Sequence, residues 1–86
     1  MQIELTPKAK KDIDYWRNTN NKAILKRIEI LFDAILQNPY KGTGKPEALK
    51  YQLLGKWSRR ITSEHRFVYA VVENTLRIYS LKGLYK

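Results

Sequence analysis

The spacing of apolar residues changes once along this chain, and that change constrains the fold most strongly. Before residue 38, apolar side chains recur every three or four positions, as at Ile24, Ile28, Leu31 and Ile35. This is the period of a helix with one buried face. After residue 50, the apolar residues alternate with polar ones, which is the period of a strand. A chain with a helical first half and an extended second half is predicted to form an α+β domain.

The first half divides into a short strand and two helices. The stretch QIEL alternates and predicts an opening strand. Thr6 is the expected N-cap of a first helix, and Pro7 takes its first position, where the missing N–H removes no hydrogen bond. NTNN ends this helix. A second helix continues to Asn38-Pro39, because the residue before a proline avoids the helical conformation.

The second half begins with an irregular loop, NPYKGTGKPEALK, that carries two prolines and two glycines. Four short strands are predicted after it: YQLLG, KWSRRITSE, HRFVYAVVE and TLRIYSL, with Glu73-Asn74 at a hairpin tip. Residues 1–86 therefore form one domain, with two N-terminal helices packed on one face of a small, mainly antiparallel twisted sheet.

Charge indicates the kind of partner. The net charge is +9, and residues 44–86 hold nine basic and three acidic side chains. From residue 34 to residue 63 there are six basic side chains but one carboxylate, Glu47. Such a surface attracts polyanions, so nucleic acid is the expected partner, with improved solubility as the alternative. The chain has no cysteine, which excludes disulfides and thiolate metal sites, and it has no long apolar run. We expect a cytoplasmic protein without a membrane partner.

One face of the predicted sheet is left open if both helices cover the other. Alternation in KWSRRITSE directs Arg60 to the open face, and Trp57, Arg59 and Ile61 to the opposite one. Arg66 begins the next strand near the same turn. An open face with arginines, flanked by the Glu47 loop and by the chain end, has the form of a functional site.

The stretches GKPEALK, WSRRI and EHRFVY, with the ending IYSLKGLYK, resemble the YoeB-type toxins of the RelE/ParE superfamily. The resemblance implies a ribosome-dependent mRNA endonuclease of a type II toxin–antitoxin system. Such an enzyme cleaves the transcript in the ribosomal A site by attack of a 2′-hydroxyl, leaving a 2′,3′-cyclic phosphate and a 5′-hydroxyl. The resemblance also implies that no metal or other cofactor is needed. The implied partners are the ribosome and a YefM-like antitoxin, with a homodimer left open.

The resemblance assigns roles to individual residues. Glu47 matches the general base, Arg66 the transition-state arginine and Tyr85 a near-terminal tyrosine. Leu84 stands where relatives carry a histidine that protonates the leaving oxygen, so attenuated cleavage is expected. The basic residues assigned to RNA phosphates are Lys45, Lys50, Arg59, Arg60 and Lys82.

The chemistry suits these residue types. A carboxylate that removes the 2′-hydroxyl proton contributes about 10²–10⁴ in rate, and a guanidinium donates paired hydrogen bonds to the oxygens of the phosphorane. The alternatives are a surface Glu47 paired with a lysine, and an Arg59 that ties down the sheet. We expect His65, the only histidine, to satisfy backbone groups at a turn.

Other interpretations stay open. Tyr51, Trp57 and Tyr69 are candidates for stacking on RNA or for the core, while Phe67 is assigned to the core. Any exposed apolar surface is a candidate for an antitoxin segment or a second subunit. The whole chain could also be an inactive RNA-, ribosome- or antitoxin-binding module, or a gyrase-poisoning protein of the same fold.

Overall fold

The structure is a computed structural model, and it describes residues 1–84. In chain order the elements are β1 (Gln2–Leu5), α1 (Pro7–Asn18), α2 (Lys22–Gln37), β2 (Glu47–Ala48), the short 3₁₀ helix η1 (Tyr51–Leu53), β3 (Trp57–Arg60), β4 (Arg66–Val72) and β5 (Thr75–Ser80). The five strands form one sheet in the order β1-β5-β4-β3-β2. Only the β1–β5 pair is parallel, so the prediction of a mainly antiparallel sheet is confirmed.

The helices begin and end where the local sequence signals place them. The Oγ1 atom of Thr6 accepts a hydrogen bond from the Ala9 N–H (3.2 Å), and Pro7 is the first residue of α1. The second helix ends at Gln37, so that Asn38 is extended ahead of Pro39. These boundaries confirm the prediction, because capping and proline geometry act over a few neighbouring residues.

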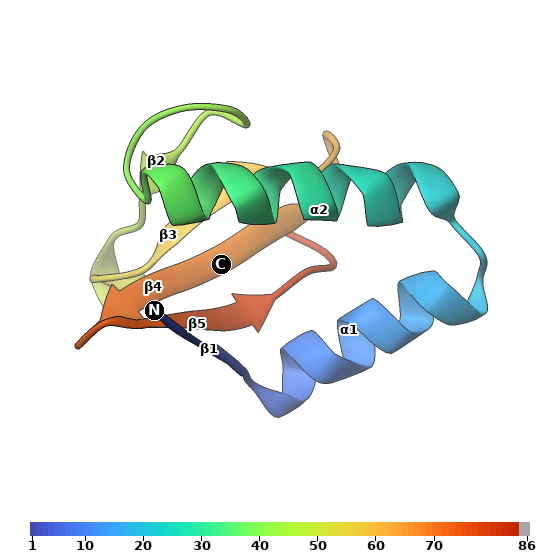
Figure 1. Cartoon of the computed structure of the whole chain (residues 1–86), viewed down its shortest axis with the longest axis horizontal. Helices are drawn as coiled ribbons and strands as arrows, with labels where there is room; N and C mark the ends of the chain where they lie inside the picture. The colour runs from blue at the N-terminus through green and yellow to red at the C-terminus, as the bar shows by residue number, and fades with distance from the viewer. Residues whose placement is uncertain (85–86) are drawn as a thin grey trace.

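One apolar cluster joins both helices to one face of the sheet. Phe67 and Tyr69 on β4, and Leu76 and Ile78 on β5, alternate along their strands and pack against apolar side chains of α1 and α2. Figure 1 shows β3, β4 and β5 side by side, with α2 along one side of them and α1 near β1. Both helices therefore lie on one face of the sheet, as predicted.

The turn between β4 and β5 has the predicted tip. Glu73 and Asn74 have φ values of 49° and 62°, and the flanking residues Val72 and Thr75 are paired. Two positive φ angles are the signature of a type I′ turn, which matches the right-handed twist of the strands it joins.

The predicted strand YQLLG is not formed. Tyr51–Leu53 instead make the 3₁₀ helix η1, and the strand that pairs with β3 lies earlier, at Glu47–Ala48. The hairpin closes where the Leu49 N–H donates to the Lys56 carbonyl (2.9 Å), and the Leu49 side chain is buried. Adjacent leucines break the alternation of a strand, and Leu54 stays exposed, so residues 50–55 serve as the connection between β2 and β3.

Candidate active site

The register of the sheet brings three of the predicted site residues to one face. Glu47 on β2 pairs with Ser58 on β3, and Arg60 on β3 pairs with Arg66 on β4. Paired residues point to the same side of a sheet, as do residues two positions apart on one strand. Phe67, next to Arg66, points into the core beneath the helices. Glu47, Arg60 and Arg66 therefore share the face that the helices leave open.

The spacing on this face suits a single phosphodiester. Diagonal neighbours on adjacent strands lie about 7–8 Å apart, which is the relation between Glu47 and Arg60. Strands two apart are separated by roughly 10 Å, which is the lateral distance between the strands of Glu47 and Arg66. Long arginine side chains span such gaps, so the three groups can converge on one ligand held above β3.

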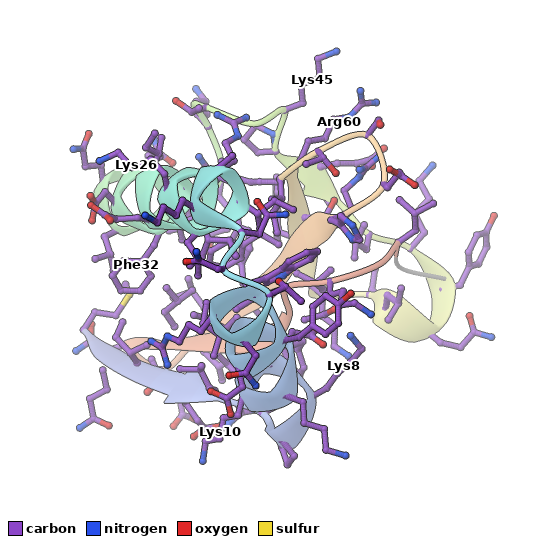
Figure 2. The ribbon with its side chains drawn as sticks, turned by 90° about the vertical axis from the view of Figure 1, so that its right-hand side faces the viewer. Lys8, Lys10, Lys26, Phe32, Lys45 and Arg60 are labelled. Carbon is purple, nitrogen blue, oxygen red and sulfur yellow. The ribbon has the colours of Figure 1, made fainter. Side chains whose placement is uncertain are left out.

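Two lysines lie beside the carboxylate. The Arg60 N–H donates to the Gly44 carbonyl (2.7 Å), which ties the loop carrying Lys45 to the end of β3. Figure 2 shows Lys45 and Arg60 at the same end of the molecule, with both side chains directed outward. Lys50 and Glu47 line one hollow of about 310 Å³ next to η1. The carboxylate thus stands among exposed cations, as the charge pattern predicted.

The side chain of Arg66 lies over the turn between β3 and β4. Its Nη1 atom donates to the carbonyls of Thr62 (2.7 Å), Ser63 (3.2 Å) and His65 (3.2 Å). A guanidinium carries further N–H donors on Nε and Nη2. The turn therefore orients the planar group through one of its nitrogens.

Arg59 corrects one assignment. Its side chain is 0% exposed, and its donors are taken by the Tyr69 hydroxyl (3.1 Å) and by the carbonyls of Thr43 (3.0 Å), Lys41 (3.0 Å) and Asn38. The prediction that Arg59 binds RNA phosphate is wrong, because none of its surface is available to a ligand. The alternative holds: Arg59 ties the loop before β2 to the sheet.

Tyr69 lies in the same buried network. Its hydroxyl donates to the Pro39 carbonyl, and burial raises the pKa of Tyr69 above its ordinary value of 10.0, an effect that the Arg59 hydrogen bond partly opposes. The stacking alternative for Tyr69 is therefore wrong, and the assignment of Phe67 to the core is confirmed. Trp57 is half-buried with its ring 5.0 Å from that of Tyr40, whereas Tyr51 is 86% exposed.

His65 performs the role predicted for it. Its Nδ1 atom accepts a hydrogen bond from the Gly83 N–H (2.8 Å), and the Arg66 N–H donates to the Gly83 carbonyl (3.0 Å). The chain end is thereby held beside the start of β4. Leu84 is exposed and lines a hollow of about 410 Å³ with Val68 on the open face.

Two further assignments concern the chain end. Tyr85 lies outside the described residues. The Lys82 side chain is placed over the ring of Tyr15 on α1, with Nζ 4.5 Å from the ring centroid. This contact directs Lys82 toward α1, so the structure does not group it with Glu47 and Arg60.

Sequence reasoning missed a polar network between α1 and the chain end. Asp12 is buried, and its carboxylate accepts from the Leu81 N–H (2.9 Å), while Trp16 donates from Nε1 to the Leu81 carbonyl (2.9 Å). The signal was present, because Asp12 falls between Ala9 and Trp16 in the apolar stripe of the first helix. A carboxylate at such a position needs a buried hydrogen-bond donor.

Within residues 1–84, no three His, Asp or Glu side chains are grouped as metal ligands would be. Neither helix in this part of the chain has the length and apolar character needed to cross a bilayer.

Comparison with known proteins identifies the class. A family model described as "YoeB-like toxin of bacterial type II toxin-antitoxin system" matches residues 5–85. This match, together with a fold of two helices on a five-stranded sheet, identifies a toxin of the RelE/ParE superfamily.

Relatives and solved structures agree with the family model. Toxin YoeB of Synechocystis sp. is 50% identical over 74 residues, which is 85% of this chain and 86% of the relative. A YoeB/ParE toxin from Agrobacterium tumefaciens has a TM-score of 0.94 at 36% identity, covering 99% of this chain and 100% of that one. The heterotetrameric YoeB-YefM complex from Staphylococcus aureus matches with a TM-score of 0.88 at 42% identity, covering 99% of this chain and 98% of that one. The chain belongs to the YoeB-like family of type II toxins.

Proposed function

We propose that this toxin is an endoribonuclease that cuts messenger RNA in the ribosomal A site without a metal ion. The observation that carries the proposal is the shared open face of Glu47, Arg60 and Arg66, which combines a carboxylate with two guanidinium groups. Family membership supports the same reading, because the matched model describes a toxin.

Glu47 acts as the general base. Its carboxylate takes the proton of the ribose 2′-hydroxyl as the 2′-oxygen attacks the adjacent phosphorus, a contribution of about 10²–10⁴ in rate. Arg66 and Arg60 donate hydrogen bonds to the non-bridging oxygens, where negative charge develops. Lys50 and Lys45 hold the neighbouring phosphates as fixed charges. The bond from phosphorus to the 5′-oxygen breaks, leaving a 2′,3′-cyclic phosphate.

The departing 5′-oxygen must gain a proton. Leucine at position 84 has none to donate, so water or the phenol at position 85 supplies it. A phenol with a pKa near 10 is a weak acid at neutral pH, and cleavage is accordingly attenuated in this chain.

The partners follow from the charge and from the relatives. A surface of net charge +9 is drawn to ribosomal and messenger RNA in the cytoplasm. The S. aureus relatives form a YoeB-YefM complex and a YoeB dimer. A YefM-like antitoxin neutralises this chain, and self-association occurs in its absence.

Glu47→Gln tests the assignment of the base. The variant should keep its affinity for ribosomes and lose cleavage by about 10²-fold or more, because an amide cannot take a proton. Primer extension on a translated message gives the cleavage, and co-sedimentation with ribosomes gives the affinity.

Glu73→Gln is the matched control, because it makes the same change of charge at a distant position. Arg66 begins β4, and Glu73 follows the last residue of that strand. It should leave both quantities unchanged. Equal loss of affinity and cleavage in Glu47→Gln would assign Glu47 to structure and not to catalysis.

A second candidate function is occupancy of the ribosome, or of an operator-bound antitoxin complex, without cutting. The exposed aliphatic side chain of Leu84 favours it, because the chain end then carries no strong acid. Arrest of translation with an intact message would establish this function and exclude cleavage.

A further inference from the structure

The chain after β5 leaves the sheet, and side chains from distant elements hold its backbone. Asp12 Oδ2 accepts from the Leu81 N–H (2.9 Å), and Trp16 Nε1 donates to the Leu81 carbonyl (2.9 Å). Both contacts are buried and join residues more than 60 positions apart. The backbone of Leu81 is therefore satisfied by α1 and not by a neighbouring strand.

The same arrangement continues along the next two residues. Lys8 Nζ donates to the Lys82 carbonyl (3.1 Å) and to Asp12 Oδ2 (2.7 Å). His65 Nδ1 accepts from the Gly83 N–H (2.8 Å), and its ring packs edge-on against Trp16 at 4.8 Å. We call the four side chains that bind this segment the tail clasp: Lys8, Asp12, Trp16 and His65.

Each member of the tail clasp has a fixed hydrogen-bonding role. An amide N–H can only donate, so His65 Nδ1 is unprotonated in this contact. The Asp12 side chain is 9% exposed. Burying a carboxylate costs free energy that its hydrogen bonds and the Lys8 ammonium offset, so such a group is weak evidence for net stability. What the Asp12 carboxylate does is fix the position of the Leu81 backbone, through the hydrogen bond that it accepts from the Leu81 N–H.

The segment held by the tail clasp ends at the open face. The Arg66 N–H donates to the Gly83 carbonyl (3.0 Å), and Leu84 shares a hollow with Val68, two residues beyond Arg66. The Cα atoms of Gly83 and Leu84 lie about 3.8 Å apart across one peptide unit. A fixed Gly83 thus limits how far Leu84 can lie from Arg66.

We propose that the tail clasp positions the chain end for cleavage: His65 and Trp16 hold Leu81 and Gly83, so that Gly83 and Leu84 stay beside Arg66, which binds the phosphate. The clasp residues act through the backbone and do not contact RNA, so they are positioning residues. This inference rests on the proposed function.

A pair of substitutions at His65 tests the proposal. His65→Leu removes the acceptor, whereas His65→Asn keeps an amide oxygen near the place of Nδ1. A misplacement of about 1 Å can cost about 10²-fold in rate, so His65→Leu should lower kcat by about that factor with KM unchanged. His65→Asn should restore most of the loss, and amide exchange at Gly83 should be fast only in His65→Leu.

Trp16→Phe provides a second variant, because it keeps an aromatic ring in the core, although a smaller one, and removes the donor to the Leu81 carbonyl. It should lower kcat in the same direction. Glu4→Gln is the control: it removes the ion pair with Arg77 (2.6 Å), which joins β1 to β5 and involves no member of the tail clasp. It should leave kcat and Gly83 exchange unchanged.

The outcomes separate the tail clasp from the proposed function. If kcat of His65→Leu, corrected for the folded fraction, equals that of the unsubstituted chain, the clasp only stabilises the fold and the proposal is overturned. If the unsubstituted chain cuts no message, the proposed function fails. Nuclear Overhauser contacts between Leu84 and Val68 then decide the positioning: their persistence in His65→Leu overturns the proposal, and their loss supports it.

Discussion

Replacing Arg59 by methionine removes the donors that hold the loop before β2, while keeping a long side chain in the same space. Arg59 is 0% exposed and makes four hydrogen bonds, three of them to loop carbonyls and one to the Tyr69 hydroxyl. The loop carries Lys45 and leads into Glu47, so its position decides where the proposed base stands.

The expected loss follows from two opposing terms. A hydrogen bond to a charged group contributes about 1.5–3 kcal/mol, so four would give about 6 kcal/mol or more. The buried guanidinium costs several kcal/mol in desolvation, and methionine carries no such cost. The carbonyls of Lys41 and Thr43 belong to exposed residues and can regain water. We expect Arg59→Met to lower the free energy of unfolding by about 2–4 kcal/mol. The total for a chain of this length is about 4–13 kcal/mol.

Urea unfolding followed by tryptophan fluorescence measures this loss. Arg60→Met is the matched control, because Arg60 is the next residue and its side chain is exposed, so a change within about 0.5 kcal/mol is expected. Amide exchange at Arg60, whose N–H donates to Gly44, should also become faster in Arg59→Met. Equal unfolding free energies for the two variants would refute the view that Arg59 holds the loop.

Three further predictions concern single positions. Gly44→Ala places a Cβ 2.6 Å from Leu31 Cδ2, whereas Gly55→Ala, at a similar positive φ, meets nothing within 4 Å. In urea unfolding, Gly44→Ala should therefore lose about 1–3 kcal/mol more than Gly55→Ala. Equal losses in the two variants would refute the clash. Burial raises the pKa of Tyr69 in the folded protein. The neutral phenol therefore contributes fully to the free energy of unfolding below about pH 10, and this contribution is lost as pH rises through the raised pKa. Between about pH 9 and pH 11, the free energy of unfolding of the unsubstituted chain should fall more steeply with pH than that of Tyr69→Phe, and an equal pH dependence in the two proteins would contradict this. Leu84→His supplies an acid for the leaving oxygen and should raise cleavage in primer extension by about 10²–10⁴; unchanged cleavage would show that position 84 has no part in the chemistry.

The local elements of the fold could be predicted because their causes are local. Thr6 with Pro7 starts a helix, Asn38-Pro39 stops one, and Glu73-Asn74 turns a hairpin through contacts between near neighbours. The prediction of a strand at YQLLG was wrong because its cause is not local. The apolar pattern of this stretch does not decide between strand and loop, and the hydrogen bond between Leu49 and Lys56 closes the hairpin before Tyr51.

The site was predicted in part. Alternation assigned Arg60 to the open face and Arg59 to the opposite one, but it could not show that three loop carbonyls and a phenol would enclose Arg59. The contacts of His65 with Gly83, and of Asp12 with Leu81, join distant parts of the chain and leave no periodic signal. Sheet register alone decided that Glu47 stands across from Ser58, and so beside Arg60.

By itself, then, the sequence determined the α+β class, the ends of both helices, the concentration of positive charge in the second half and the family to which the chain belongs. The tertiary structure decided which groups enclose Arg59, where β2 begins and what holds the chain end. The physical reason is range. Backbone preferences and periodicity act within a few residues, whereas a buried hydrogen-bonding partner is chosen by packing between segments that the sequence leaves far apart.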